Sequence, residues 1–429
     1  MSAFHPFLAP VAVALVLSQS APADAQDPVA DVRALIGGAS FQRASASLGS
    51  DHDRWVREIV TLTEIPAPPF GEQARAEAFA GLMRDIGLAE VGIDAAGNVL
   101  GLRRGDGDGD DLIVVSAHLD TVFPAGVDLT VRREGDRLYA PGVGDDSTGL
   151  ASLLSLARAM NAADIRTGSD ILFVGTVGEE GLGDLRGVRY LFEQGPYRGR
   201  IDAFISIDGA QSGRLVDVGV GSKRYRITFR GPGGHSYGAF GIVNPAAALG
   251  RAITDFYETP VPETPKATYS VSVVGGGVSV NSIPGETWME VDMRSADPGE
   301  LAKLETRLLA VASEAATAEN DARSTRDGRI TVEAKPIGDR PAGSTPHTSS
   351  LVRYAEAAHA AFDQPVTFSA SSTDSNVPMS LAIPALTLPR AFDGGRTHST
   401  DEWVDVSEAP NTRLRTILLA TVLAVAGAR

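Results

Sequence analysis

Apolar runs of strand length recur along the chain, and several of them end abruptly in acidic or imidazole side chains near glycines. The runs at 112–117, 171–177 and 201–207 all have this form. Unbroken apolar runs of this length are typical of strands that are buried on both faces of a parallel sheet. Because ligands bind beyond the carboxyl ends of such strands, the polar residues that follow these runs are the candidate functional residues.

Helical patterns alternate with these strands. Residues 51–88 show helix spacing that is interrupted at EIPAPPF. Residues 140–160 predict a glycine-rich turn that leads into an amphipathic helix, and the tail from Val406 predicts a C-terminal helix. Strands that alternate with helices predict an α/β fold.

The segment 213–339 differs in character from the rest. Its strand-like and helix-like stretches follow one another in the order β-α-β-β-α-β, which predicts a compact unit of four strands and two helices. We therefore expect a domain formed by 26–212 and 340–429, with a second domain at 213–339 inserted into it. A chain of 429 residues is too long for one ordinary core, which agrees with two domains.

The first 25 residues have the pattern of an export signal. An apolar run from Phe7 to Leu17 precedes a polar stretch that ends in the small-x-small sequence Ala23-Asp24-Ala25. The run is too short to span a membrane, and no later run reaches the required length. We expect an exported protein, periplasmic or secreted, with no membrane partner and a mature chain that begins at Gln26.

Composition limits the possible partners and ligands. The net charge of −16 argues against nucleic acid and anionic lipid as partners, because the attraction to phosphate would be reversed. The chain has no cysteine, so any metal ion has to be bound by histidine and carboxylate side chains. The acidic run at 105–111 lacks the spacing and the closing glutamate of an EF-hand, and we interpret it as a solvated hairpin turn.

Two adjacent carboxylates follow the apolar run at 171–177. Glu179 and Glu180 stand between two glycines. Neighbouring carboxylates at a strand end repel each other unless a positive charge holds at least one of them, and a metal ion is the usual positive charge. The alternative is a solvated acidic turn.

His118 and Asp120 form a second candidate pair, at the end of the run at 112–117. In an extended segment, residues i and i+2 share a face, so both side chains are expected to point the same way. This suits a metal-binding histidine that a carboxylate orients. The alternative is a structural hydrogen bond.

Three further candidates lie at strand ends or glycine turns. Asp145 is held in a glycine-rich turn, whereas Asp146 and Ser147 fit the chemistry of a helix N-cap. Asp208 ends an apolar strand, and His398 follows a Gly-Gly turn. With His118 and Glu180 these residues make five candidate ligands.

The order of these residues resembles that of the co-catalytic zinc exopeptidase and aminoacylase superfamily, which includes peptidase T, glutamate carboxypeptidase, acetylornithine deacetylase and succinyl-diaminopimelate desuccinylase. The resemblance covers residues from about 52 to 429. It implies an α/β fold with a mixed, mostly parallel sheet flanked by helices, and an inserted α+β lid and dimerisation domain. The matching segments are SAHLDTV, GVGDDSTG, VGEEGLGD, SIDG, GPGGHS, NSIPG, DMR and RTHSTDE.

The resemblance also implies a dinuclear metal site. One zinc ion would be bound by His118 and Asp208 and the other by Glu180 and His398, with Asp145 bridging the two. Ligands of this kind without thiolate suit zinc, although cobalt or manganese could occupy the same positions.

The same resemblance assigns roles to residues beside the ligands. Glu179 would be the general base, which takes a proton from water and returns it to the leaving amine. Asp120 would orient His118. The bridging Asp145 is followed by Asp-Ser-Thr without the lysine common in relatives, which puts local substrate contacts in doubt.

The inserted segment supplies the implied substrate contacts. His235 matches a histidine that, in dimeric members, reaches the partner chain's site and helps to hold the oxyanion. Asn281 and Arg294 match residues that bind the substrate carboxylate, a role suited to the guanidinium group, and Arg340 is a weaker candidate for it. For each of them the alternative is a structural contact.

The favoured function is that of a zinc-dependent exopeptidase that hydrolyses small peptides and acts as a homodimer through its lid domain. The alternative is an amidohydrolase that removes the acyl group of an N-acyl amino acid at the same site. Asp208 stands where deacylase-like members usually place glutamate, which favours a peptidase. A third hypothesis is a metal-binding dimer without catalysis, against which the intact Glu179 and the full ligand set argue.

Overall fold

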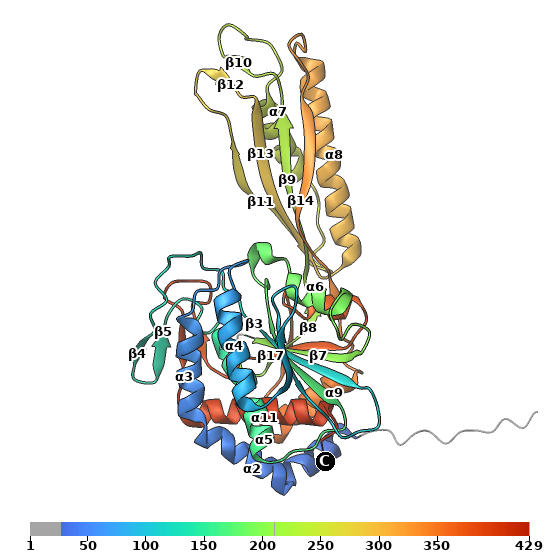
Figure 1. The fold of residues 1–429 in the computed structure, drawn as a ribbon. Helices are drawn as coiled ribbons and strands as arrows, with labels where there is room; N and C mark the ends of the chain where they lie inside the picture. The colour runs from blue at the N-terminus through green and yellow to red at the C-terminus, as the bar shows by residue number, and fades with distance from the viewer. Residues whose placement is uncertain (1–26, 210, 429) are drawn as a thin grey trace, which may run out of the picture.

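The computed structural model describes residues 27–209 and 211–428, so the predicted export signal lies outside the described residues and stays a prediction. Figure 1 shows a broad α/β part and a narrow α+β part that rises from it. The two ends of the chain build the broad part and its middle builds the narrow one. This arrangement confirms the predicted fold class. Within the described ranges, no helix has the length and apolar character that crossing a membrane requires.

A nine-stranded mixed sheet forms the centre of the α/β part. Its middle strands β6, β3, β7 and β17 run parallel, so their carboxyl ends lie at one edge. Antiparallel pairs join β1, β2, β8 and β15 to the sheet, and β16 runs parallel to β8. The strands are β1 Ala89–Ile93, β2 Val99–Arg103, β3 Leu112–His118, β6 Asp170–Thr176, β7 Ile201–Gly209, β8 Arg214–Gly219, β15 Gly343–Ser344, β16 Thr367–Ser371 and β17 Ala385–Pro389.

Helices cover both faces of this sheet. Alternate residues of β3 point to opposite faces, so Ile113 and Val115 share a core with α5, whereas Leu112 and Val114 share one with α6. The predicted amphipathic helix, α5, is instead buried on nearly all sides, because α2, α3 and α11 also pack against it. The helices are α1 Pro28–Gly37, α2 Ala39–Ser50, α3 His52–Thr63, α4 Gln73–Ile86, α5 Ser147–Ala162, α6 Arg186–Glu193, α9 Ser350–Ala361, α10 Asn376–Ser380 and α11 Glu408–Val425.

The inserted part has the predicted β-α-β-β-α-β order. Its antiparallel sheet runs β11-β13-β9-β14, and α7 and α8 pack on it around a core that includes Phe229 and Met289. Because β8 belongs to the nine-stranded sheet, the inserted sheet begins at Gly221, and the boundary predicted at residue 213 is too early. The elements are β9 Gly221–Arg230, β10 Gly234–His235, α7 Pro245–Tyr257, β11 Ala267–Gly276, β12 Ser282–Ile283, β13 Glu286–Ser295, α8 Pro298–Ala322 and β14 Thr331–Arg340.

A second, four-stranded sheet connects two of the segments that carry candidate residues. A small sheet of β4 (Arg132–Glu134), β5 (Arg137–Tyr139), β18 (Gly394–Gly395) and β19 (Trp403–Asp405) joins the segment that carries His398 to the strand before the Asp145 turn.

The acidic run at 105–111 is largely exposed, as predicted. It is not a hairpin turn, because β6 lies between the two strands that it connects.

Candidate metal centre

The candidate ligands meet at the carboxyl edge of the parallel strands. His118 is the last residue of β3 and pairs in register with Thr176, the last residue of β6. Glu180 follows β6 in the next loop, and Asp208 lies near the end of β7, which is the other neighbour of β3. The parallel register therefore brings residues that are far apart in the chain to one point.

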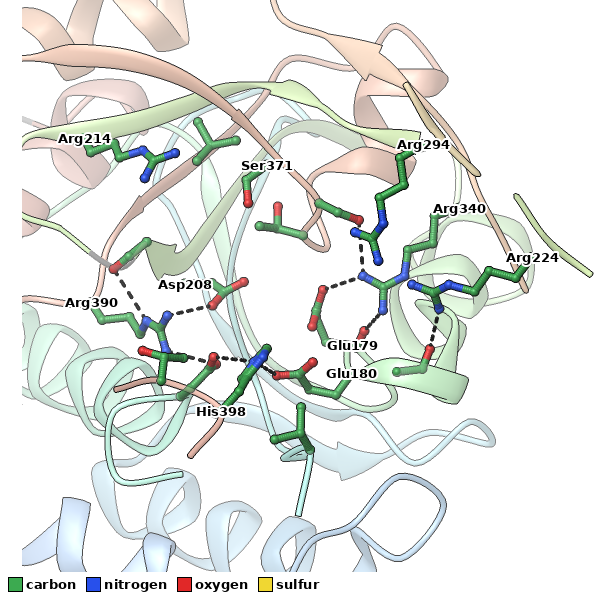
Figure 2. A pocket seen from close by; sticks show the side chains of 18 residues that line it. Glu179, Glu180, Asp208, Arg214, Arg224, Arg294, Arg340, Ser371, Arg390 and His398 are labelled. Atoms are coloured by element: carbon green, nitrogen blue, oxygen red, sulfur yellow. Dashed lines mark hydrogen bonds and ion pairs between the residues drawn. The ribbon is translucent and has the colours of Figure 1, made fainter. Parts of the chain in front are cut away.

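Asp145 lies between the two histidines. Its Oδ1 is 2.8 Å from His118 Nε2, and its Oδ2 is 3.2 Å from His398 Nε2. On the first side Asp208 Oδ1 is 3.7 Å from His118 Nε2, and on the second side Glu180 Oε1 is 2.8 Å from His398 Nε2. One carboxylate thus joins two positions, each with one histidine and one further carboxylate. Figure 2 shows the contact between His398 and Glu180.

This set of atoms fits divalent metal ions. His118 Nδ1 lies 2.9 Å from the backbone oxygen of Asp120, so in the neutral ring the lone pair of Nε2 faces the carboxylates. Ligand atoms of His118, Asp145 and Glu180 lie within 4.8 Å of one another, and a cation among them removes their mutual repulsion. Hydrogen bonds to Asp145 and Glu180 raise the pKa of His398 to about 10, which reflects the negative charge gathered at this point.

The carboxylate of Asp120 positions the two glutamates, and the contact of Asp120 with the histidine is through its backbone oxygen. Its carboxylate Oδ1 is 3.8 Å from His118 Nδ1, too far for the predicted hydrogen bond. The same carboxylate accepts hydrogen bonds from Glu179 N at 3.0 Å and from Glu180 N at 2.8 Å. In the described structure the Asp120 carboxylate makes no hydrogen bond to His118, and its predicted role in orienting this ring stays a prediction. The strand ends at His118, so the rule that residues i and i+2 share a face does not extend to Asp120.

Asp146 does not act as the predicted cap. It occupies the N-cap position of α5, but its side chain makes no capping hydrogen bond. Its Oδ2 instead accepts a hydrogen bond from His118 N at 2.9 Å, which fixes the backbone that carries this ligand. The peptide bond between Asp145 and Asp146 is cis.

Glu179 is buried beside the ligands without sharing their contacts. Its Oε1 lies 3.2 Å from Arg340 Nη1, and its backbone oxygen accepts a second hydrogen bond from the same guanidinium, as Figure 2 shows. Burial raises the pKa of Glu179 well above its usual value, against the opposing effect of Arg340. A buried carboxyl group with a raised pKa in this position is a candidate for proton exchange.

Glu402 fixes the turn that carries Asp145. Its Oε1 accepts hydrogen bonds from Gly144 N at 3.0 Å and Asp145 N at 2.9 Å, and its Oε2 accepts one from Gly142 N at 3.0 Å. Glu402 is only 1% exposed. The sequence reasoning misses this role, although Glu402 belongs to the matching segment RTHSTDE, because side-chain contacts to a distant backbone leave no spacing pattern.

A cavity of about 420 Å³ opens over the candidate ligands. Arg294 and Arg224 share one partner, Asp292, at 2.7 Å and 2.9 Å. Two guanidinium groups on one carboxylate leave a net positive charge, which favours an anionic group of a substrate. Five arginines line the cavity: Arg214, Arg224, Arg294, Arg340 and Arg390.

His235 and Asn281 do not reach this cavity in their own chain. Both are exposed on the short ribbon of β10 and β12, where Ser236 N donates to Asn281 O at 2.9 Å. Figure 1 shows this ribbon at the end of the inserted part that is farthest from the nine-stranded sheet. Of the predicted substrate residues, Arg294 and Arg340 line the cavity, while His235 and Asn281 lie at the tip.

Fold and site together define a two-domain α/β protein with a candidate dinuclear metal centre. The model for "Peptidase family M20/M25/M40" matches residues 114–417, and the chain belongs to this family. The match confirms the resemblance seen in the sequence. By this description it is a peptidase family, and a solved structure from Sulfolobus solfataricus is described as an M20 family metallo-carboxypeptidase.

Several solved structures share the fold. An aminopeptidase PepT from Bacillus cereus has 20% identity and a TM-score of 0.70, over 87% of this chain and 99% of that one. A di-peptidase from Saccharomyces cerevisiae has 14% identity and a TM-score of 0.71, over 90% and 98%. A dinuclear metal binding peptidase from Bacillus subtilis has 17% identity and a TM-score of 0.65, over 88% and 99%. A comparison with curated protein sequences finds no match.

The contacts of Glu402 give a first prediction. In Glu402→Gln one oxygen that accepts a backbone hydrogen bond becomes an amide donor, so the Asp145 turn loses part of its support. We expect zinc affinity, measured by equilibrium dialysis, to fall by about 10- to 100-fold, as for other residues that support metal ligands. Glu408→Gln, at an exposed position of α11, is the control and should bind zinc as the unchanged protein does. Equal zinc affinity in Glu402→Gln and Glu408→Gln would show that the Asp145 turn keeps its conformation without the Glu402 carboxylate.

Proposed function

We propose that this protein is a dinuclear, zinc-dependent exopeptidase that hydrolyses small peptides. The observation that carries the proposal is the position of Asp145, whose two oxygens face the two histidines of separate ligand sets. His118 and Asp208 would hold one ion, and Glu180 and His398 the other. Ions bound there would polarise the scissile carbonyl and make water acidic enough to be deprotonated at neutral pH.

Glu179 is proposed as the general base. It takes a proton from the attacking water and delivers it to the leaving amine, which requires a group that is protonated and deprotonated near neutral pH. Its raised pKa supports this role, because burial disfavours its charged form. Arg340 holds the Glu179 side chain from one side, and hydrogen bonds from the backbone to Asp120 hold the loop from the other.

Arg294 and Arg340 are proposed to bind the terminal carboxylate of the peptide. They line the same cavity as the ligands, and its volume of about 420 Å³ suits a substrate of a few residues. Recognition of a chain end explains why cleavage would be confined to small peptides. The relatives described as an aminopeptidase and a di-peptidase agree with a peptide substrate. The alternative substrate, an N-acyl amino acid, carries the same carboxylate.

We further propose that the active unit is a homodimer formed through the lid domain. His235 and Asn281 lie far from the cavity of their own chain, so only a second chain can bring them to a site. Among the described residues, β11 pairs with β13 on one side and forms an edge of the inserted sheet on the other. Large apolar side chains are exposed around the ribbon: Tyr237, Phe240, Val273, Val274, Val278 and Val280. Apolar groups beside an open strand edge favour association with a second copy.

Metal-loaded protein incubated with a dipeptide library and with N-acyl amino acids tests the proposed reaction. We expect free amines to be released from dipeptides, and a chelator to abolish and zinc to restore the activity. Release from N-acyl amino acids alone would replace the exopeptidase with an amidohydrolase. Active protein that contains less than one ion per chain would contradict the two-metal site.

The adjacent glutamates should respond differently to the same change. Glu179→Gln should keep both metal ions and the fold, while kcat falls by about two or more orders of magnitude, because a positioned acid–base group is lost. Glu180→Gln should lose one metal ion. Metal content, measured by elemental analysis, and kcat are determined for both variants, and each variant is the control for the other. Equal metal content and equal residual rates would contradict the assignment.

The dimer proposal predicts complementation between inactive chains. His235→Ala should lower kcat by about two to three orders of magnitude without loss of zinc, because a group that holds the oxyanion is removed. Mixed with Glu179→Gln, it should form heterodimers in which one site has both residues intact, and activity should return. Differently tagged chains first establish that subunits exchange. Heterodimers that form and stay inactive would contradict action across the dimer.

A further inference from the structure

A buried arginine, Arg390, lies among the candidate metal ligands. It follows β17 directly, and the register of that strand places Pro389 opposite Gly209 on β7, next to Asp208. Arg390 N donates to Gly209 O at 3.0 Å, and its own backbone oxygen accepts a hydrogen bond from Ser152 at 3.3 Å. The residue is 3% exposed. Its guanidinium is therefore held in place rather than free to move into solvent.

The contacts of Arg390 fall on one of the two metal positions. Its Nη1 is 2.9 Å from Asp145 Oδ1, and its Nη2 is 3.7 Å from Asp208 Oδ1. These are the same two oxygens that face His118 Nε2. Figure 2 shows the guanidinium beside Asp208, on the side of the cavity away from Arg340.

The other metal position has no such competitor. Within the described residues, Glu180 pairs with His398 and with no lysine or arginine. Arg340, which lines the same cavity, pairs with Glu179, which is not a proposed ligand. A guanidinium therefore contacts the oxygens that face His118, whereas on the other side the Arg340 guanidinium contacts a residue that is not a proposed ligand.

We propose that Arg390 makes the two metal positions unequal, so that the position of His118 and Asp208 binds a divalent cation more weakly than the position of Glu180 and His398. A guanidinium remains charged under all ordinary conditions. It repels a cation at short range from the oxygens which that cation would need. The protein would then load one ion tightly and a second ion only at higher metal concentration.

This inference rests on the proposed metal-dependent function and adds an order of loading to it. Isothermal titration of metal-free protein with zinc should show two steps whose dissociation constants differ by at least tenfold, about 1.4 kcal/mol. Arg390→Met, which removes the charge and keeps much of the volume, should tighten the weaker step by at least tenfold. Arg415→Met removes another buried arginine, which contacts His52 and Ser155 instead of the ligands, and should leave both steps unchanged.

Two further variants assign the steps without touching Arg390. His398→Asn should lose the tight binding step and keep the weak one. His118→Asn should lose the weak step and keep the tight one. These variants test which position is the weaker one even where Arg390→Met fails to fold, and a tight step at the position of His118 and Asp208 would overturn the proposal.

Three results would overturn the proposal. The first is that the two dissociation constants of the unchanged protein are equal. The second is that the weak step of folded Arg390→Met is unchanged or lost. The third is that His398→Asn retains the tight step. Protein that binds no zinc at all would instead remove the metal-dependent function on which the inference rests.

Discussion

Repulsion among buried carboxylates is the constraint on which the functional edge of this protein depends. Four parallel strands end at one edge and deliver several acidic side chains to a single cavity. Like charges out of water are unfavourable unless cations lie among them. Two of the necessary charges are built into the chain as Arg340 and Arg390, and the geometry of Asp145 between two histidines is suited to divalent ions.

Acidic residues at this edge serve two different purposes. Asp145, Glu180 and Asp208 turn their oxygens toward histidine nitrogens, whereas Asp120, Asp146 and Glu402 accept hydrogen bonds from backbone amides of the loops that carry those groups. The carboxylates that accept backbone hydrogen bonds fix the segments that carry the candidate ligands. Without such support, repulsion among the ligand carboxylates would push these segments apart. Charge alone does not separate the two sets.

The inserted domain is coupled to the centre at its base and separated from it at its tip. Arg340 ends β14 and reaches Glu179, and Arg224 on β9 donates to Gly181 O at 2.9 Å, so both connecting strands touch the glutamate loop. His235 lies at the opposite end of the same domain. An active site that uses both the base and the tip of the inserted domain would take them from two different chains. The proposed reaction therefore depends on the proposed dimer.

The sequence by itself determined the alternation of strands and helices, the order of the inserted domain and the identity of the polar groups at strand ends, because periodicity and local chemistry are read along the chain. It did not determine which strands are neighbours: β6 lies between β2 and β3, so an expected hairpin is a longer connection, and β8 joins the larger sheet. Nor did it reveal the atoms that Asp120 contacts, or the roles of Glu402 and Arg390. These depend on contacts between residues that are 59 to 260 positions apart, and only the pairing of strands in the folded chain brings such residues together.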